Sequence, residues 1–105
     1  MNKKIIISYN KYYNEGNGGI YNQTIKISKD LVDLINNKIK EIKRDKKHIE
    51  FYNNHDYIYV AEIEKDKINW LSLTNVRIIK YILNDLEVNT SRIKKDRNTR
   101  LVILD

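Results

Sequence analysis

The stretch from Ser28 to Lys47 constrains the fold of this 105-residue chain most, because its apolar residues recur at helical spacing. At about 100° per residue they fall on one broad stripe of a helix. The stripe consists of Leu31, Val32, Leu34, Ile35, Ile39 and Ile42. Ser28 can accept a hydrogen bond from a first-turn N–H, and cations crowd the far end, where the helix dipole favours them. The pattern therefore predicts an amphipathic helix over residues 28–47 that packs on another layer of the protein.

The opposite face of this predicted helix is polar. We interpret it as solvated surface, with a binding role as the alternative, because lysine normally lies outside. The face carries Lys29, Asn36, Lys40, Lys43 and Lys47, with Asp33 and Arg44 near its edge.

Short β-branched or alternating runs on both sides of the helix predict strands. Before it, residues 3–9 are typical of a central strand buried on both faces, and residues 20–27 alternate as a second strand. After it, three alternating runs indicate an antiparallel meander with one solvent-exposed face. These runs span residues 49–52, 57–63 and 68–73.

A second helix is predicted after Thr74, which can cap its first turn, and it should end near Asp85 and Glu87, which oppose its dipole. Residues 88–100 are polar and basic, so we expect a loop or a mobile extension, and the apolar run 101–104 predicts a final strand. The sequence thus predicts a single α+β domain over residues 1–105. It places one layer of two helices on a mostly antiparallel sheet, in the order ββαβββαβ.

Composition excludes several function classes. The chain has no cysteine, which excludes disulfides, thiol nucleophiles and thiolate zinc sites. It shows neither a membrane-spanning apolar run nor a secretory signal, so we expect a soluble, cytoplasmic protein. Its 18 isoleucines, 15 lysines and 14 asparagines have AT-rich codons, which indicates a low-GC genome or mobile element. The net charge of +6 is therefore a weak indication of nucleic-acid binding, and residues 48–73 are net acidic.

Two segments have the composition of binding surfaces. Around the glycine loop at residues 16–19, tyrosines interleave with a lysine, as in single-stranded nucleic-acid sites and protein interfaces, although half-buried sheet tyrosines are the commoner case. The members of this cluster are Tyr9, Lys11, Tyr12, Tyr13 and Tyr21. The second segment can track phosphates, fit an acidic protein groove or be a solvated loop. This segment contains Arg92, Lys94, Lys95, Arg97 and Arg100. The C-terminal end of the helix predicted over residues 28–47 adds four further candidate binding residues, Lys40, Lys43, Arg44 and Lys47.

Signatures of catalysis and of metal binding are weak. The glycine loop precedes a strand rather than a helix, so we interpret it as a turn with positive φ angles rather than a phosphate loop. His48, His55 and Asp56 lack the spacing of known metal-ligand sets, and nothing fixes the geometry that acid–base work on RNA would need. We therefore assign no catalytic, cofactor-binding or metal-binding residue and expect no cofactor.

Three function classes remain open. We expect a non-enzymatic inhibitor or adaptor that binds a host protein or nucleoprotein complex, as a phage or mobile-element product would. An anti-defence protein that blocks a CRISPR effector is one example. The alternative is direct nucleic-acid binding through the basic surface and the Tyr-rich loop, and a small nuclease is the third. No membrane role is expected, and an exposed edge strand would allow a monomer or a homodimer.

Overall fold

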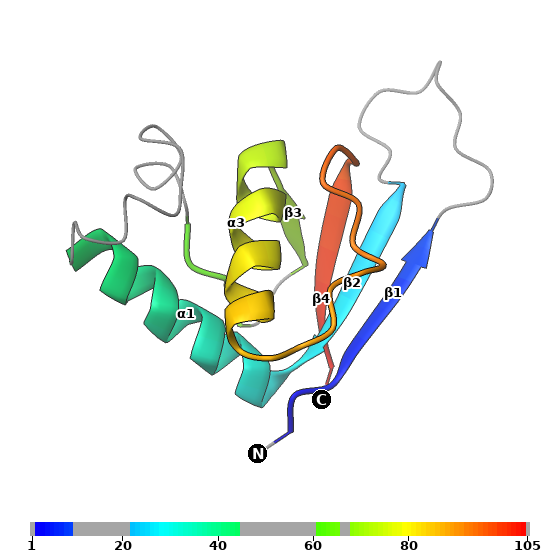
Figure 1. Cartoon of the computed structure of the whole chain (residues 1–105). Helices are drawn as coiled ribbons and strands as arrows, with labels where there is room; N and C mark the ends of the chain where they lie inside the picture. The colour runs from blue at the N-terminus through cyan, green and yellow to red at the C-terminus, as the bar shows by residue number, and fades with distance from the viewer. Residues whose placement is uncertain (1, 10–21, 45–60, 66–67, 105) are drawn as a thin grey trace.

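The computed structural model describes residues 2–9, 22–44, 61–65 and 68–104. It shows an α+β fold in which two helices pack on one side of a mixed four-stranded sheet (Figure 1). The elements in chain order are β1 (Ile5–Tyr9), β2 (Gln23–Ser28), α1 (Lys29–Arg44), β3 (Asn69–Leu71), α3 (Leu73–Asp85) and β4 (Thr99–Leu104). The fold class predicted from the sequence is confirmed.

The strands lie in the order β1-β2-β4-β3. β1 and β2 form an antiparallel pair in which Ile7 lies opposite Ile25, and β3 is antiparallel to β4. The central pair, β2 and β4, is parallel, with Ile25 opposite Leu101. A parallel pair needs a long crossover, which α1, β3 and α3 supply between these two strands. The final predicted strand therefore exists, but it enters the centre of the sheet.

The prediction that residues 3–9 form a central strand buried on both faces is wrong. β1 is an edge strand of the described sheet, and Ile7 is its only buried residue. Ile6 on its other face is 42% exposed. β-branched residues suit any half-buried pleated surface, so their presence does not distinguish a central strand from an edge strand.

The core lies between the sheet and the two helices. Ile25, Ile27 and Leu101 on the central strands are 0% exposed. The predicted stripe of α1 packs against them, and most of its side chains are buried. The buried residues of α3 are Val76, Ile78, Ile79, Ile82 and Leu83. Burying each such side chain contributes about 1.5–3 kcal/mol, so the apolar stripe decides how α1 lies on the sheet.

Two asparagine side chains fix the segment before β3 by pairing with its backbone. Asn36 on α1 accepts from the Ile63 N–H at 2.7 Å and donates to the Ile63 C=O at 2.9 Å. Asn69 pairs in the same way with Glu64, at 2.9 and 3.0 Å. Asn36 is 8% exposed, so its placement on the solvent face of the helix was wrong. Its amide is buried because it has these two partners.

These amide pairs explain why part of the predicted meander is not a strand. Residues 61–63 belong to the run predicted over 57–63, yet they have no strand pairing. The backbone of Ile63 and Glu64 bonds to side-chain amides instead, so it does not need a neighbouring strand. Residues 49–52 and 57–60 lie outside the described residues, and the predicted strand at 68–73 is present as β3.

A serine marks the start of both described helices. Ser28 Oγ accepts from the Leu31 N–H at 3.4 Å, as the sequence predicted. α3 begins after Ser72, whose Oγ accepts from the Asn75 N–H at 3.1 Å. Thr74 therefore lies inside the first turn and is not the cap. Serine and threonine are both good capping residues, and Ser72 is used rather than Thr74 because β3 ends at Leu71, directly before it.

Candidate functional site

A tight turn at the end of α3 directs the chain back towards the sheet. α3 ends at Asp85, as predicted, and Glu87 has a φ of 64°, a left-handed conformation that glycine usually supplies. The Glu87 N–H donates to the Asn84 C=O at 3.0 Å, and the Val88 N–H donates to the Leu83 C=O at 2.9 Å. These two bonds define a Schellman motif. Val88 is buried, so the chain that leaves the helix is held against the core.

The residues that follow this turn form a fixed loop, so the mobile alternative of the prediction is not what the structure shows. Ile93 is 1% exposed, and the Ile93 N–H donates to the Thr90 C=O at 3.0 Å. Gln23 on β2, itself 0% exposed, accepts from the Lys94 N–H at 2.7 Å and donates to the Lys94 C=O at 3.1 Å. The loop is therefore held in two ways, by the buried side chain of Ile93 and by the buried amide of Gln23.

Tyr9 of the predicted tyrosine cluster also contacts this loop. Its hydroxyl donates to the Arg92 C=O, and the Arg92 guanidinium lies over its ring, 5.7 Å from the centroid. This distance is within the range of a cation–π interaction. Tyr9 is 39% exposed, so it supports the loop and leaves part of its ring on the surface.

Cations from α3 and from the loop surround one hollow of about 250 Å³, which we call the basic hollow. It is lined by Arg77, Lys80, Tyr81, Asn84, Thr90 and Lys95. Every charged lining residue that the structure describes is positive. Lys80 Nζ donates to the Ile93 C=O at 2.8 Å, which holds this ammonium beside the loop. Like charges around one depression produce a positive potential that favours an acidic group.

The structure brings some predicted site residues together and separates others. Lys95 lines the basic hollow, and Lys94 and Arg97 are exposed on the same loop. Arg100 lies in β4, one residue after Thr99. Thr99 Oγ1 bonds to Gln23, on the helix side of the sheet, so Arg100 lies on the other face, because successive strand residues alternate.

The cations at the end of α1 do not join the basic hollow. Lys40, Lys43 and Arg44 are exposed there, and Figure 1 shows this end of α1 on the other side of α3 from residues 88–98. The remaining predicted or candidate residues lie outside the described residues. They are Lys11, Tyr12, Tyr13, Gly16, Gly18, Gly19, Tyr21, Lys47, His48, His55 and Asp56.

Sequence reasoning missed the half of the hollow that α3 supplies. Arg77, Tyr81 and Asn84 recur at helical spacing on the polar side of that helix, and Lys80 lies beside them. This spacing is visible in the sequence. It became informative only when the structure placed Lys95 against the same side of α3.

The face of the sheet away from the helices carries an exposed tryptophan. Trp70, the only tryptophan of the chain, is 61% exposed and lies opposite Arg100 in the β3–β4 register. Lys26 on β2 and Ile6 on β1 face the same side, because they lie opposite each other and alternate with the buried Ile25 and Ile7. Both described helices lie on the other side of the sheet (Figure 1), yet this face is not open throughout, because Thr24, which lies opposite Arg100, is 3% exposed.

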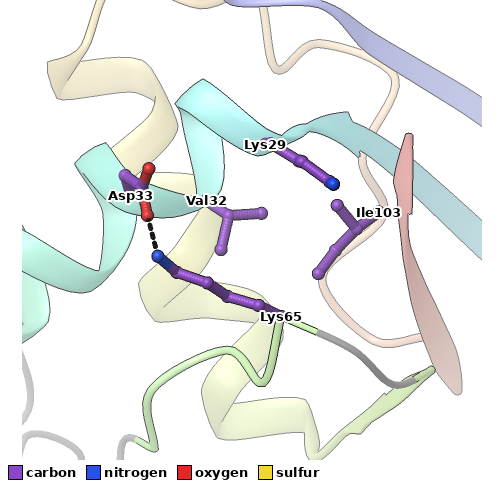
Figure 2. A pocket seen from close by; sticks show the side chains of 5 residues that line it. All are labelled: Lys29, Val32, Asp33, Lys65 and Ile103. Atoms are coloured by element: carbon purple, nitrogen blue, oxygen red, sulfur yellow. Dashed lines mark ion pairs between the residues drawn. The ribbon is translucent and has the colours of Figure 1, made fainter. Parts of the chain in front are cut away.

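A smaller pocket of about 140 Å³ lies between α1, residue 65 and β4 (Figure 2). Val32 and Ile103 form apolar walls, and Lys65 Nζ lies 2.6 Å from Asp33 Oδ1. Both side chains of this ion pair are more than half exposed, and such pairs contribute only about 0–1 kcal/mol. The described lining residues include no nucleophile–base pair, so the pocket has no arrangement for catalysis.

The described part of the chain contains no group of three or more His, Asp or Glu side chains that could hold a metal ion. Within the same residues, no helix has the length and apolar character needed to cross a membrane. Comparisons with protein-family models, with curated proteins and with solved structures find no match to this chain. The functional argument therefore rests on the basic hollow.

Proposed function

We propose that the protein is a small non-enzymatic inhibitor or adaptor that docks the basic hollow onto an acidic surface of a host protein or nucleoprotein complex. The observation that carries this proposal is the convergence of Arg77, Lys80 and Lys95 from two separate elements around one depression. If residues 92–97 were only a solvated basic loop, cations of the neighbouring helix α3 would have no reason to lie around the same depression. The low-GC composition supports a phage or mobile-element origin.

The fixed loop favours binding because it lowers the entropy lost on association. Gln23 and Tyr9 already hold the backbone of Lys94 and Arg92 in the absence of a partner. A loop that must order itself on binding loses affinity, whereas a pre-organised loop does not. Lys95 therefore meets a partner from a defined position.

The composition of the hollow favours a protein surface or a nucleoprotein. Tyr81, which is 37% exposed, and Asn84 add an aromatic ring and an amide beside the cations. Tyrosine and arginine are enriched among the residues that dominate interface energies. Positive charge raises the rate of encounter with an acidic partner and makes the affinity fall as salt rises.

Two variants with the same loss of charge test the proposal. Lys80→Gln with Lys95→Gln removes two charges from the hollow and keeps a hydrogen-bond donor at each position. Lys40→Gln with Lys43→Gln removes two charges from the exposed end of α1 and serves as the control. Immobilised parent protein should capture a defined protein from nuclease-treated host extract. The control should capture it equally, and the hollow variant should bind it about tenfold more weakly or worse.

Other results would overturn the proposal. Equal capture by all three proteins would exclude the hollow as the docking surface. If untreated extract yields nucleic acid and treated extract yields nothing, the protein binds nucleic acid directly, which is the alternative function. The absence of any captured molecule would also contradict docking.

A further inference from the structure

The outer edge of β1 has backbone groups that the described sheet does not use. On the inner edge, the Ser28 N–H donates to the Lys4 C=O at 3.0 Å, which continues the β1–β2 pairing by one position. In an antiparallel pair only alternate residues bond to the neighbouring strand. The N–H and C=O groups of Ile5 and Ile7 therefore point to the outer edge, where no described residue pairs with them.

β1 lacks the devices that usually protect an edge strand. Its sequence, Ile-Ile-Ile-Ser-Tyr, contains neither a proline nor a charged residue. Such residues normally prevent a free edge from pairing with another chain. Ile6 is 42% exposed and Ser8 is also exposed, so the surface beside these backbone groups is accessible. The strand can therefore accept one more strand beside it.

A hollow of about 280 Å³, which we call the edge groove, lies between β1 and the segment that follows α3. Figure 1 shows this segment, in orange, reaching across the sheet towards β1. Lys3 Nζ donates to the Leu86 C=O at 3.2 Å, and the Tyr9 hydroxyl donates to the Arg92 C=O, so the segment is held at both ends of the strand. A groove that is already formed costs less entropy to fill. Its described lining residues are Ile5, Ile6, Ile7, Asn89, Ser91 and Arg92.

The edge groove is distinct from the basic hollow, although the same segment borders both. Thr90 and Lys95 line the hollow beside α3. Asn89, Ser91 and Arg92 line the groove instead. Isoleucines of β1 form the opposite wall of the groove, and Arg92 is the only charged residue in its described lining. The two depressions therefore suit different ligands.

The charge at both ends of β1 is positive. Lys3 and Lys4 precede the strand, and the Arg92 guanidinium lies over Tyr9 at its far end, 5.7 Å from the ring centroid. Lys3 and Tyr9 are roughly 20 Å apart along an extended chain. A second copy paired antiparallel at this edge would bring Lys3 and Lys4 of one copy beside Arg92 of the other. Like charges disfavour that pairing, whereas a strand with acidic ends meets opposite charge at both.

We therefore propose that the edge groove binds an extended segment of another protein, apolar in its centre and acidic at both ends, as an added strand beside β1. Main-chain hydrogen bonds to Ile5 and Ile7 supply the affinity, and alternate side chains enter the groove and supply the specificity. The acidic residues lie beside Arg92 at one end and Lys4 at the other. This site does not rest on the basic hollow, and each can fail its own test separately.

A synthetic peptide with blocked ends tests the proposal. It has about nine residues, with alternating valine and threonine between two aspartates at each end. Added to isotope-labelled full-length protein, it should shift the NMR signals of β1 and of residues 89–92 and slow the solvent exchange of the Ile5 and Ile7 amides. Two control peptides should bind about tenfold more weakly or worse. One is N-methylated along its backbone and has no N–H donors, and the other has lysine in place of aspartate.

Protein variants separate the edge from the charge. Ile5→Pro removes an outward N–H and leaves the bonds to β2, as proline on an edge strand can, whereas Ile5→Val keeps the N–H. The proline variant should bind the peptide about tenfold more weakly than the valine variant, and circular dichroism checks that both are folded. Lys4→Gln with Arg92→Gln should weaken binding about three- to tenfold. Lys94→Gln with Arg97→Gln removes two charges from residues that do not line the groove and should leave binding unchanged.

Four results would overturn the proposal. The first is no peptide binding, or equal binding of the N-methylated peptide. The second is a shift of signals at residues 77–84 with none at β1, which would assign the peptide to the basic hollow. The third is slow exchange of the Ile5 and Ile7 amides in the free monomer, which would show that another segment of this chain already pairs with β1. The fourth is a dimer in sedimentation that Ile5→Pro dissociates, which would make a second copy the occupant.

Discussion

Replacement of Gln23 by methionine tests whether one buried amide fixes the loop that carries the proposed binding cations. Gln23 is 0% exposed, and its amide pairs with the Lys94 N–H and C=O at 2.7 and 3.1 Å. It also donates to Thr99 Oγ1 at 2.9 Å. Methionine has nearly the same length and adapts to the same space, but it offers neither the donor nor the acceptor. The variant therefore removes the bonds and leaves little empty volume.

The expected loss of stability comes from the N–H and C=O groups of Lys94, which both lose their hydrogen-bond partner in the variant. A buried group without a partner costs about 1–3 kcal/mol. The lower part of this range applies, because both bonds are only partly buried and water can reach them. Thr99 keeps one bond, since its hydroxyl also donates to the Arg97 C=O at 2.8 Å. We expect Gln23→Met to lower the free energy of unfolding by about 2 kcal/mol.

Urea unfolding followed by circular dichroism measures this loss, with Lys94→Ala as the matched control. The control keeps the backbone groups that Gln23 binds and removes only an exposed side chain. It should stay within about 0.5 kcal/mol of the parent. Gln23→Met should also weaken partner binding, because Lys95 follows directly on the released residue. A Gln23→Met protein as stable as the control would refute the reasoning.

Two further predictions concern the ends of α3, and thermal or urea unfolding checks both. Ser72→Ala should lower the free energy of unfolding by about 1 kcal/mol, because the Asn75 N–H loses its acceptor, whereas Thr74→Ala should have less effect, because Thr74 is not the cap. Glu87→Gly should raise the free energy of unfolding by about 0.5–1 kcal/mol, since glycine removes the left-handed strain but adds freedom to the unfolded chain. Equal losses at Ser72 and Thr74, or a loss of stability at Glu87, would contradict the description of the helix ends.

The helices were predictable from the sequence because their signals are local. The stripe of α1 lies within a few turns, and the acidic residues at the end of α3 mark its last turn. Strand position is not local. The isoleucines at 5–7 suit an edge strand as well as a central one, and only pairing with β2 on one side decides between them.

Asparagine was the residue type that the sequence explained least. Its abundance followed from AT-rich codons, yet Asn36 and Asn69 replace strand pairing for Ile63 and Glu64. No pattern in the sequence marks an amide that will meet a distant backbone, because both partners must first be brought together by the fold. This is why the predicted strand at 57–63 failed where it is described.

The candidate binding surfaces were half predictable for the same reason. Composition identified the cations of residues 92–97, which are close together in the chain. It could not join Lys95 to Arg77 and Lys80, because that requires the turn at Glu87 and the packing of the loop on α3. Arg100, predicted as part of the same basic segment, lies in β4, and its side chain is on the other face of the sheet from Thr99, because successive strand residues alternate.

The most direct test of the central claim is hydrogen–deuterium exchange of the protein alone and in complex with its captured partner. Exchange reports on each backbone segment separately. We predict slower exchange in the complex at residues 77–84 and 90–95, which carry the basic hollow, and no change at residues 38–44 of α1. Protection at residues 38–44 with none at the hollow would contradict the account.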